Sequence, residues 1–249
     1  MNYYIITGTS RGIGEALALQ LLAPSSHIIC ISRTLNPRLT ELATERNSAC
    51  TQLAFDLLEL KQIDSLFDEI VRIIGQDHQP NSIALINNAG MLSPVSPAER
   101  LDAQAIADNV TLNLLAPMTM TAAFLRAMEA WQVDKRILNV SSGSAKFLLP
   151  GQSCYSTSKA GLDTFSKSVN VEQQTKSHRV KIASVYPGMI DTQMQSEIRE
   201  LDAETFPHVG LFIQAAEQGQ LQTPAYTAEK LLALLNSDDF GSEPLVEAL

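Results

Sequence analysis

The stretch TGTSRGIG, residues 7–14, follows a short apolar run at residues 3–6 and decides the fold. It contains three glycines, Gly8, Gly12 and Gly14. Glycines between a strand and a helix allow a tight turn and let a pyrophosphate approach the backbone, and the free N–H groups at the helix start attract phosphates. Ordinary turns also collect glycine, so the loop alone is a weak indication. After the first strand of an alternating α/β chain, it favours dinucleotide binding.

Strand-like and helix-like segments alternate along the chain. Apolar, β-branched runs typical of buried strands cover residues 3–6, 27–31, 51–55, 82–86, 136–140 and 181–185, and residues 244–249 form a seventh candidate. Helical periodicity covers residues 13–22, 37–47, 60–74, 98–131 with a break near 113–117, 153–176, 192–199, 205–218 and 227–236. The alternation predicts the α/β class, as a single Rossmann-type doubly wound domain with a mostly parallel sheet of about seven strands flanked by helices. We expect one domain over residues 1–249, with a substrate-side segment at about 188–226.

Charge and cysteine content argue against several classes of protein. With 27 acidic and 18 basic residues the net charge is −9, so we expect no basic face for nucleic acid or anionic lipid. The three cysteines lack CxxC spacing and the four histidines lack metal-ligand spacing, so neither a disulfide framework nor a metal site is expected. No apolar run approaches the roughly 18 residues of a membrane span, and the first residues show no basic leader region. We therefore expect a cytoplasmic protein without nucleic-acid or membrane partners.

Four further motifs follow the glycine loop in order. They are NNAG at 87–90, NVSSG at 139–143, YSTSK at 155–159 and PGMIDT at 187–192. Together with the Gly-x3-Gly-x-Gly spacing of the loop, they resemble the short-chain dehydrogenase/reductase family over residues 3 to about 192. The resemblance implies an enzyme that binds a nicotinamide dinucleotide and reduces a carbonyl group of a small molecule.

Tyr155 and Lys159 lie four residues apart in a predicted helix, so their side chains share one face. A Lys⁺ beside a Tyr favours the phenolate, and we expect it to lower the pKa of Tyr155 toward neutrality. By the resemblance, Tyr155 is the proton donor, Lys159 also binds the nicotinamide ribose, and Ser142 donates to the substrate oxygen. The resemblance makes Asn113 the residue whose backbone helps to position a water that links Lys159 to solvent. A bend in the long helix before Pro117 is the alternative role for Asn113.

The end of the second predicted strand bears on the choice between NADP and NAD. It reads CISRT, with Ser32, Arg33 and Thr34 where an acidic residue usually holds a free 2′-hydroxyl. Arg33 and Arg11 of the glycine loop converge where a 2′-phosphate would lie, and a planar guanidinium suits phosphate. We therefore expect NADP(H), with two solvated surface arginines as the alternative.

The glycine loop and the resemblance together give the expected cofactor contacts. These are Gly8, Ser10, Arg11, Gly12, Ile13, Gly14, Arg33, Asp56, Asn88, Tyr155, Lys159, Ile190 and Thr192. By the resemblance, Asp56 lies near the adenine, Asn88 lines the adenosine side, and Ile190 and Thr192 hold the carboxamide. For Asp56, a helix N-cap explains the carboxylate equally well.

Longer stretches resemble one branch of the family. They are NLLAPM at 113–118, GMIDTQMQSEIRE at 188–200 and GQLQTPAYTAEKLLALLNSDDFGS at 219–242, and they are similar to sepiapterin reductases and still more to bacterial relatives that reduce benzil to (S)-benzoin. That resemblance implies NADPH-dependent reduction of one carbonyl of a vicinal diketone. An apolar pocket for it could come from residues 147–149 and 206–213, with core packing as the alternative. The tail PLVEAL at 244–249 lacks the last acidic residue of sepiapterin reductases, which weakens the pterin hypothesis.

Three functions stay open at this point. The first is a diketone reductase, and the second is a reductase of the same fold for sepiapterin or a 3-oxoacyl thioester. The third is a catalytically silent NADP-binding regulatory protein, against which the set Asn113, Ser142, Tyr155 and Lys159 counts. The family resemblance also implies a homodimer formed through the helices at 98–131 and 153–176.

Overall fold

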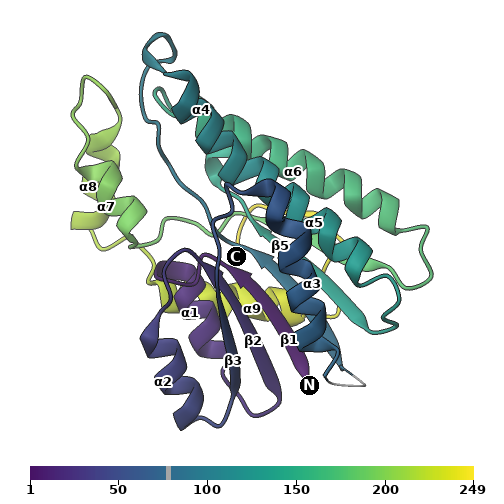
Figure 1. The fold of residues 1–249 in the computed structure, drawn as a ribbon. Coiled ribbons are helices and arrows are strands. Elements are labelled where there is room, and N and C mark those ends of the chain that lie inside the picture. Colours follow the sequence, from purple (N-terminus) through teal and green to yellow (C-terminus); the bar gives the residue numbers. More distant parts are fainter. Residues whose placement is uncertain (77–79) are drawn as a thin grey trace.

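Seven parallel strands form one sheet with helices on both faces (Figure 1). The computed structural model describes residues 1–76 and 80–249. The strand order is β3-β2-β1-β4-β5-β6-β7. The strands are β1 (Asn2–Thr7), β2 (Ser26–Ser32), β3 (Ala49–Ala54), β4 (Ser82–Asn87), β5 (Asp134–Val140), β6 (Val180–Val185) and β7 (Leu245–Val246). Each neighbouring pair is parallel, which confirms the predicted α/β class and Rossmann-type sheet.

The helices divide between the two faces of the sheet. One face carries α1 (Gly12–Leu21), α2 (Pro37–Glu45) and α9 (Pro224–Asn236), and the other carries α3 (Ile63–Ile74), α5 (Ala116–Ala127) and α6 (Ser153–Gln173). The helix α4 (Ala103–Val110) leads toward α5, whereas α7 (Gln193–Arg199) and α8 (Val209–Glu217) project beyond the sheet (Figure 1). Within the described part of the chain, we find no helix with the length and apolar character to cross a bilayer.

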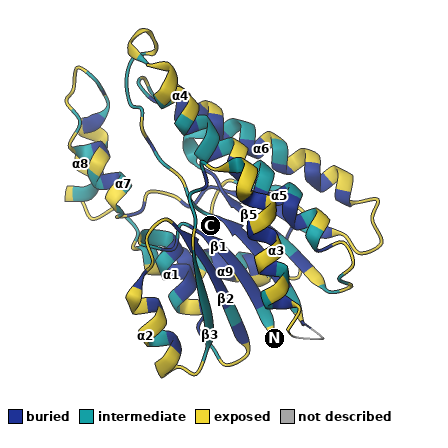
Figure 2. Cartoon of the chain, in the orientation of Figure 1, coloured by how far each residue is buried: buried dark blue, intermediate teal, exposed yellow. Residues whose placement is uncertain are grey.

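Alternation along the strands builds two cores. In β1, Tyr4 and Ile6 belong to the core under α1 and α9, whereas Tyr3 and Ile5 belong to the core under α3 and α5. Figure 2 shows buried residues through the sheet and exposed residues on the outer faces of the helices. Because helices cover both faces, the strands are continuous apolar runs rather than alternating ones.

The strand order reverses between β1 and β4, and this reversal positions the site. The chain moves outward from β1 to β3, returns to β4 beside β1, and then moves outward on the other side. Loops that leave the carboxyl ends of two such strands diverge and open a crevice. The glycine loop follows β1 and the NNAG turn lies at the end of β4, so both border this crevice.

Three observed elements differ from the predicted ones. Residues 98–131 contain a 3₁₀ turn, η2 (Ala98–Arg100), then α4, a π-helical segment, η3 (Thr111–Leu115), and α5. At the predicted break near residues 113–117 the helix changes from π-helical to α-helical winding, and the chain does not leave the helix. Pro117 lies in the first turn of α5. The last strand is shorter than residues 244–249. Helix α8 begins at Val209, after a separate turn in which the Asp202 carboxylate accepts from the Thr205 N–H at 2.7 Å.

Candidate functional site

A cleft of about 1050 Å³ opens at the carboxyl edge of the sheet, at the crevice between the β1 and β4 loops. The predicted site residues that line it are Gly8, Ser10, Arg11, Gly12, Ile13, Arg33, Asp56, Asn88, Ser142, Tyr155, Lys159, Ile190 and Thr192. Gly14 and Asn113 lie behind this lining, where Gly14 contacts Gly8 and Asn113 hydrogen-bonds Met91. The fold therefore gathers residues from six separate loops at one site.

The glycine loop requires glycine for two different reasons. Gly8 and Gly12 have φ values of +74° and +62°, which L side chains rarely adopt. At Gly14, in the first turn of α1, a Cβ would lie 2.1 Å from the Gly8 carbonyl oxygen, so loop and helix meet backbone to backbone. The α1 N-cap, Arg11, offers no side-chain cap, which leaves the first helical N–H groups available to an anion. This part of the cleft fits the pyrophosphate of a dinucleotide.

Asn88 and Thr192 support the loop from two other segments. The Asn88 backbone N–H donates to Thr7 Oγ1 at 2.9 Å, and Asn88 Nδ2 donates to the Thr7 carbonyl at 2.9 Å. A Cβ on Gly12 would lie 3.6 Å from Thr192 Cγ2, so the segment after β6 lies against the loop. Ile190 anchors that segment through a parallel bridge with Gln222. Asn88 and Thr192 therefore support the glycine loop and also line the cleft.

Arg11, Arg33 and Asp56 lie at one end of the cleft. Both arginines are exposed, and neither forms an ion pair with another described residue. The Asp56 carboxylate accepts from the Leu58 N–H at 3.0 Å and fixes the turn after β3. It is not a helix N-cap, because the next helical turn follows Glu59. Two unpaired guanidinium groups thus give an acidic protein a local positive site.

Ser142, Tyr155 and Lys159 lie together at the other end. Tyr155 and Lys159 project from the start of α6, and Ser142 follows β5. The Tyr155 and Ser142 side chains form a hydrogen bond, and the Lys159 Nζ lies 5.7 Å from the centroid of the Tyr155 ring. That Nζ donates to the Val140 carbonyl at 2.8 Å. Ser141 points away, as strand alternation predicts, and donates to the Lys159 carbonyl at 3.4 Å.

The pKa values at this end differ from the expectation. Burial raises the pKa of Tyr155 above its ordinary value, and the hydrogen bond with Ser142 offsets this only in part. Burial also lowers the pKa of Lys159 to about 8, against the opposing effect of the Asp163 carboxylate. The prediction that the pKa of Tyr155 is lowered toward neutrality is therefore wrong for the chain by itself, because removing the phenol from water outweighs the hydrogen bond with Ser142.

The buried Asn113 side chain ties η3 to the NNAG turn. Its Nδ2 donates to the Met91 carbonyl at 2.8 Å, and its Oδ1 accepts from the Met91 N–H at 3.0 Å. Gly90 separates it from the reacting end: a Cβ there would lie 3.0 Å from Asn113 Oδ1 and 3.7 Å from Lys159 Nζ. Asn113 is thus close to Lys159 and lies within the π-helical segment.

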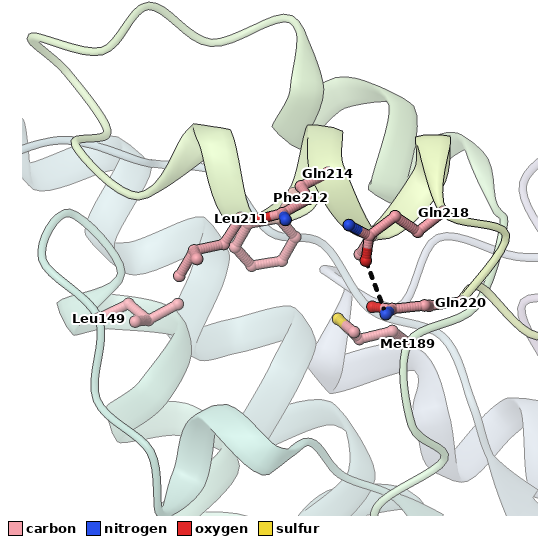
Figure 3. A pocket seen from close by; sticks show the side chains of 8 residues that line it. Leu149, Met189, Leu211, Phe212, Gln214, Gln218 and Gln220 are labelled. Carbon is pink, nitrogen blue, oxygen red and sulfur yellow. Dashed lines mark hydrogen bonds between the residues drawn. The ribbon is translucent and has the colours of Figure 1, made fainter.

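A second cavity of about 500 Å³ adjoins the cleft and shares Leu149, Met189 and Phe212 with it. Figure 3 shows these three side chains and Leu211 as its apolar lining. Its polar lining is a set of amides, Gln214, Gln218 and Gln220, in which Gln220 donates to Gln218 at 2.9 Å. The cavity combines a large apolar surface with a polar border, as small-molecule sites do.

The pocket predicted from residues 147–149 and 206–213 is confirmed in part. Leu149, Leu211 and Phe212 line the second cavity, whereas Leu148 is exposed and lines neither space. Phe206 is fully buried and packs against Phe212 with ring centroids 5.5 Å apart. Core packing therefore accounts for Phe206, and the cavity is lined instead by Leu149, Leu211 and Phe212.

Two of the described histidines pack against aromatic rings, whereas His178 is exposed. The His27 ring lies 5.4 Å from the Tyr3 ring, and the His208 ring lies 6.5 Å from the Phe206 ring, centroid to centroid. His78 lies outside the described residues. In residues 1–76 and 80–249, we find no group of three or more His, Cys, Asp or Glu side chains that could hold a metal ion.

Three residues near the reacting end were not identified from sequence. Gln152 and Tyr186 line the cleft, and Asp163 lies behind it as the hydrogen-bond acceptor of Tyr186. Asp163 follows Lys159 by one helical turn, so the spacing that pairs Tyr155 with Lys159 could have identified it. Tyr186 had no such signal, because its place depends on how β6 pairs with β5.

The glycine loop at a parallel-sheet switch point and the paired Tyr and Lys side chains define a dinucleotide-type oxidoreductase site. The family model described as short chain dehydrogenase matches residues 2–203. The chain therefore belongs to the short-chain dehydrogenase family, whose members use NAD(P)(H), and is an oxidoreductase acting on CH–OH or C=O groups.

Curated relatives match nearly the whole chain. It is 42% identical over 240 residues to the Bacillus cereus benzil reductase ((S)-benzoin forming), with 96% of each chain covered. It is 35% identical over 235 residues to the Bacillus subtilis (strain 168) benzil reductase ((S)-benzoin forming), covering 94% of this chain and 93% of that one. The Rattus norvegicus sepiapterin reductase is more distant, at 31% identity over 249 residues, with 96% and 92% covered.

Solved structures share the fold. The KRED1-Pglu enzyme superposes with a TM-score of 0.83 at 25% identity, covering 99% of this chain and all of the other. A metagenomic short-chain oxidoreductase in complex with NADP gives a TM-score of 0.74 at 23% identity, covering 100% and 97%. These neighbours confirm the Rossmann-like sheet flanked by helices.

Proposed function

We propose that this protein is an NADPH-dependent carbonyl reductase that reduces one carbonyl of a vicinal diketone, as in the conversion of benzil to benzoin. The observation that carries the proposal is the meeting of Ser142, Tyr155 and Lys159 at the end of the cleft that adjoins the apolar cavity. The 42% identity to a benzil reductase supports the substrate class. The test is whether the purified protein consumes NADPH and forms benzoin when benzil is added; NADPH binding without any turnover would contradict it.

Each side chain has a separate task in this proposal. Bound NADPH would supply hydride to the carbonyl carbon, which side chains cannot do. Ser142 donates a hydrogen bond to the carbonyl oxygen, and Tyr155 gives that oxygen its proton, so that C=O becomes CH–OH. The raised pKa of Tyr155 suits the reduction of a carbonyl, because the phenol stays protonated and can donate its proton to the carbonyl oxygen. Lys159 holds the ribose and stabilises the phenolate that remains.

NADP rather than NAD is proposed from the two unpaired guanidinium groups at the adenosine end. We expect Arg33→Ala to weaken NADPH binding about 10-fold, equivalent to about 1.4 kcal/mol, and to leave NADH binding unchanged, because a charged contact to the 2′-phosphate is lost. NADPH and NADH fluorescence titrations measure both. Arg38→Ala, which removes an exposed arginine of α2 outside the cleft, is the control. Equal losses for the two cofactors in Arg33→Ala would contradict the assignment.

The second cavity is proposed to hold the aryl group farther from the reacting carbonyl. We expect Leu211→Ala, at a position that lines the second cavity and not the cleft, to raise KM for benzil about fivefold while leaving KM for butane-2,3-dione unchanged, because the small diketone does not reach this cavity and the loss is part of one apolar contact. Leu211 is 57% exposed, so the change costs little stability. Steady-state kinetics with Leu148→Ala, an exposed apolar position that lines neither space, provide the control. A parallel rise for both diketones would contradict this placement.

The alternative substrate and the oligomeric state are two further proposals. Sepiapterin is the alternative substrate, supported by 31% identity to a sepiapterin reductase. A homodimer through the outer faces of α4, α5 and α6 is supported by exposed apolar side chains there, Ile106 on α4 and Val171 on α6.

A further inference from the structure

The proposed chemistry does not use the buried carboxylate of Asp163. It lies on α6 one turn after Lys159, so the two side chains lie on the same helix face. It is only 5% exposed, and a buried charge is costly unless it is compensated. Its Oδ1 accepts from the Ser184 hydroxyl at 2.5 Å, and its Oδ2 accepts from the Tyr186 hydroxyl at 2.7 Å. Both donors come from β6 or directly after it, so the carboxylate is held from a second element.

The ammonium group of Lys159 is also a buried charge. Lys159 is 4% exposed, and its Nζ donates a hydrogen bond to a neutral group, the Val140 carbonyl. Tyr155, on the same helix, presents a protonated phenol and therefore no charge. The other charged groups that line the cleft are Arg11, Arg33, Asp56, Asp108, Glu197 and Glu247. Asp163 is the carboxylate whose charge acts on Lys159. Burial, Asp163 and, to a smaller extent, Glu247 raise the pKa of Tyr186.

We propose that Asp163 is a positioning residue that keeps Lys159 in its ammonium form, and that Ser184 and Tyr186 fix the Asp163 carboxylate for this purpose. The inference rests on the proposed function only where it predicts an effect on the rate of reduction. Because the carboxylate makes its short hydrogen bonds to hydroxyl groups, its charge acts on Lys159 through space. The burial of Lys159 favours the neutral amine, and the carboxylate opposes that loss.

The direct test is the pKa of Lys159 in protein labelled with ¹³C-lysine, followed by NMR of its Cε signal, which Lys159→Arg identifies. The wild-type value is expected at about 8. Asp163→Asn keeps the side-chain shape and removes the charge, and it should lower this pKa by about one unit or more. Ser184→Ala keeps the charge but removes one of the two hydrogen bonds that fix the carboxylate, so it should lower the pKa of Lys159 by less than Asp163→Asn does. Glu172→Gln removes an exposed charge from the same helix and should change nothing. An unchanged pKa in folded Asp163→Asn would overturn the proposal.

The pH dependence of the reduction rate gives a second readout, with a definite expected direction. Reduction needs the ammonium form of Lys159, so its rate falls as pH rises through the Lys159 pKa. In Asp163→Asn this fall moves to lower pH, so the rate matches wild type at about pH 6 and is about fivefold lower at about pH 8. A uniform loss at every pH would indicate a merely structural effect and contradict the proposal. The NMR measurement needs no substrate, so failure of the diketone assignment leaves this test intact.

A double variant covers the case in which Asp163→Asn alone does not fold. Lys159→Met would leave the Asp163 carboxylate buried without a compensating charge, which is strongly destabilising. Adding Asp163→Asn should then raise the free energy of unfolding above that of Lys159→Met alone, measured in urea. A double variant that is less stable than Lys159→Met would contradict the coupling.

Discussion

Replacing Tyr155 by Phe is expected to reduce diketone turnover by about 10³-fold or more while NADPH binding stays within about twofold of wild type. The phenol is the proton donor of the proposed reaction, and Phe keeps the ring that packs with Leu92, Ile198, Phe206 and Val209. The loss should therefore appear in kcat and not in stability. NADPH consumption with benzil measures the first quantity, and NADPH fluorescence titration measures the second.

The control for this variant is another tyrosine. Tyr226→Phe removes the same hydroxyl from a side chain that is 47% exposed at the start of α9, and we expect full activity. If Tyr155→Phe also turned over benzil at the wild-type rate, the proton would have to come from another group, and the assignment of the reacting end of the cleft would fail.

The second large effect is expected at Gly14. In Gly14→Ala the new Cβ would lie 2.1 Å from the Gly8 carbonyl oxygen and 2.8 Å from its carbon. Both atoms are backbone, so the clash cannot be relieved by rotating a side chain, and the loop and α1 must separate. We expect a loss of about 3 kcal/mol in the free energy of unfolding and at least about a 10-fold weakening of NADPH binding, since the phosphate cradle opens. Urea denaturation and fluorescence titration measure the two losses.

Gly210 offers a matched position outside the loop. A Cβ there meets nothing within 4 Å, and Gly210 lies inside α8, where Ala is the better helix former. Gly210→Ala is therefore expected to raise the free energy of unfolding by up to about 1 kcal/mol. Equal behaviour of the two variants would mean that Gly14 has no special contact with Gly8, against the packing described for the loop.

Local patterns predicted the fold and most of the cleft because their causes are local. A glycine loop after a strand, apolar strands covered on both faces, and a Tyr and a Lys one helical turn apart each follow from short-range geometry. The topology then brings these segments together at the carboxyl edge of the sheet. This is why Asn88 and Thr192, far apart in sequence, both support the glycine loop.

The predictions that failed depend on burial and on long-range contacts. The direction of the Tyr155 pKa shift is set by how much water the folded chain removes, which the Tyr–Lys spacing does not encode. Helix α8 begins after the turn in which Asp202 accepts from Thr205, and Phe206 is core rather than lining because α8 folds back over it. The contact of Tyr186 with Asp163 joins β6 to α6 and had no sequence signal.

The most direct test of the central claim is a comparison of benzil, sepiapterin and an acetoacetyl thioester as substrates of the purified protein with NADPH. We predict that benzil is turned over with the highest kcat/KM and that one benzoin forms for each NADPH consumed, because the cavity beside the reacting end suits an aryl group. A higher kcat/KM for sepiapterin or the thioester would contradict the diketone assignment. Tight NADPH binding with no turnover of any of the three would contradict the reductase itself.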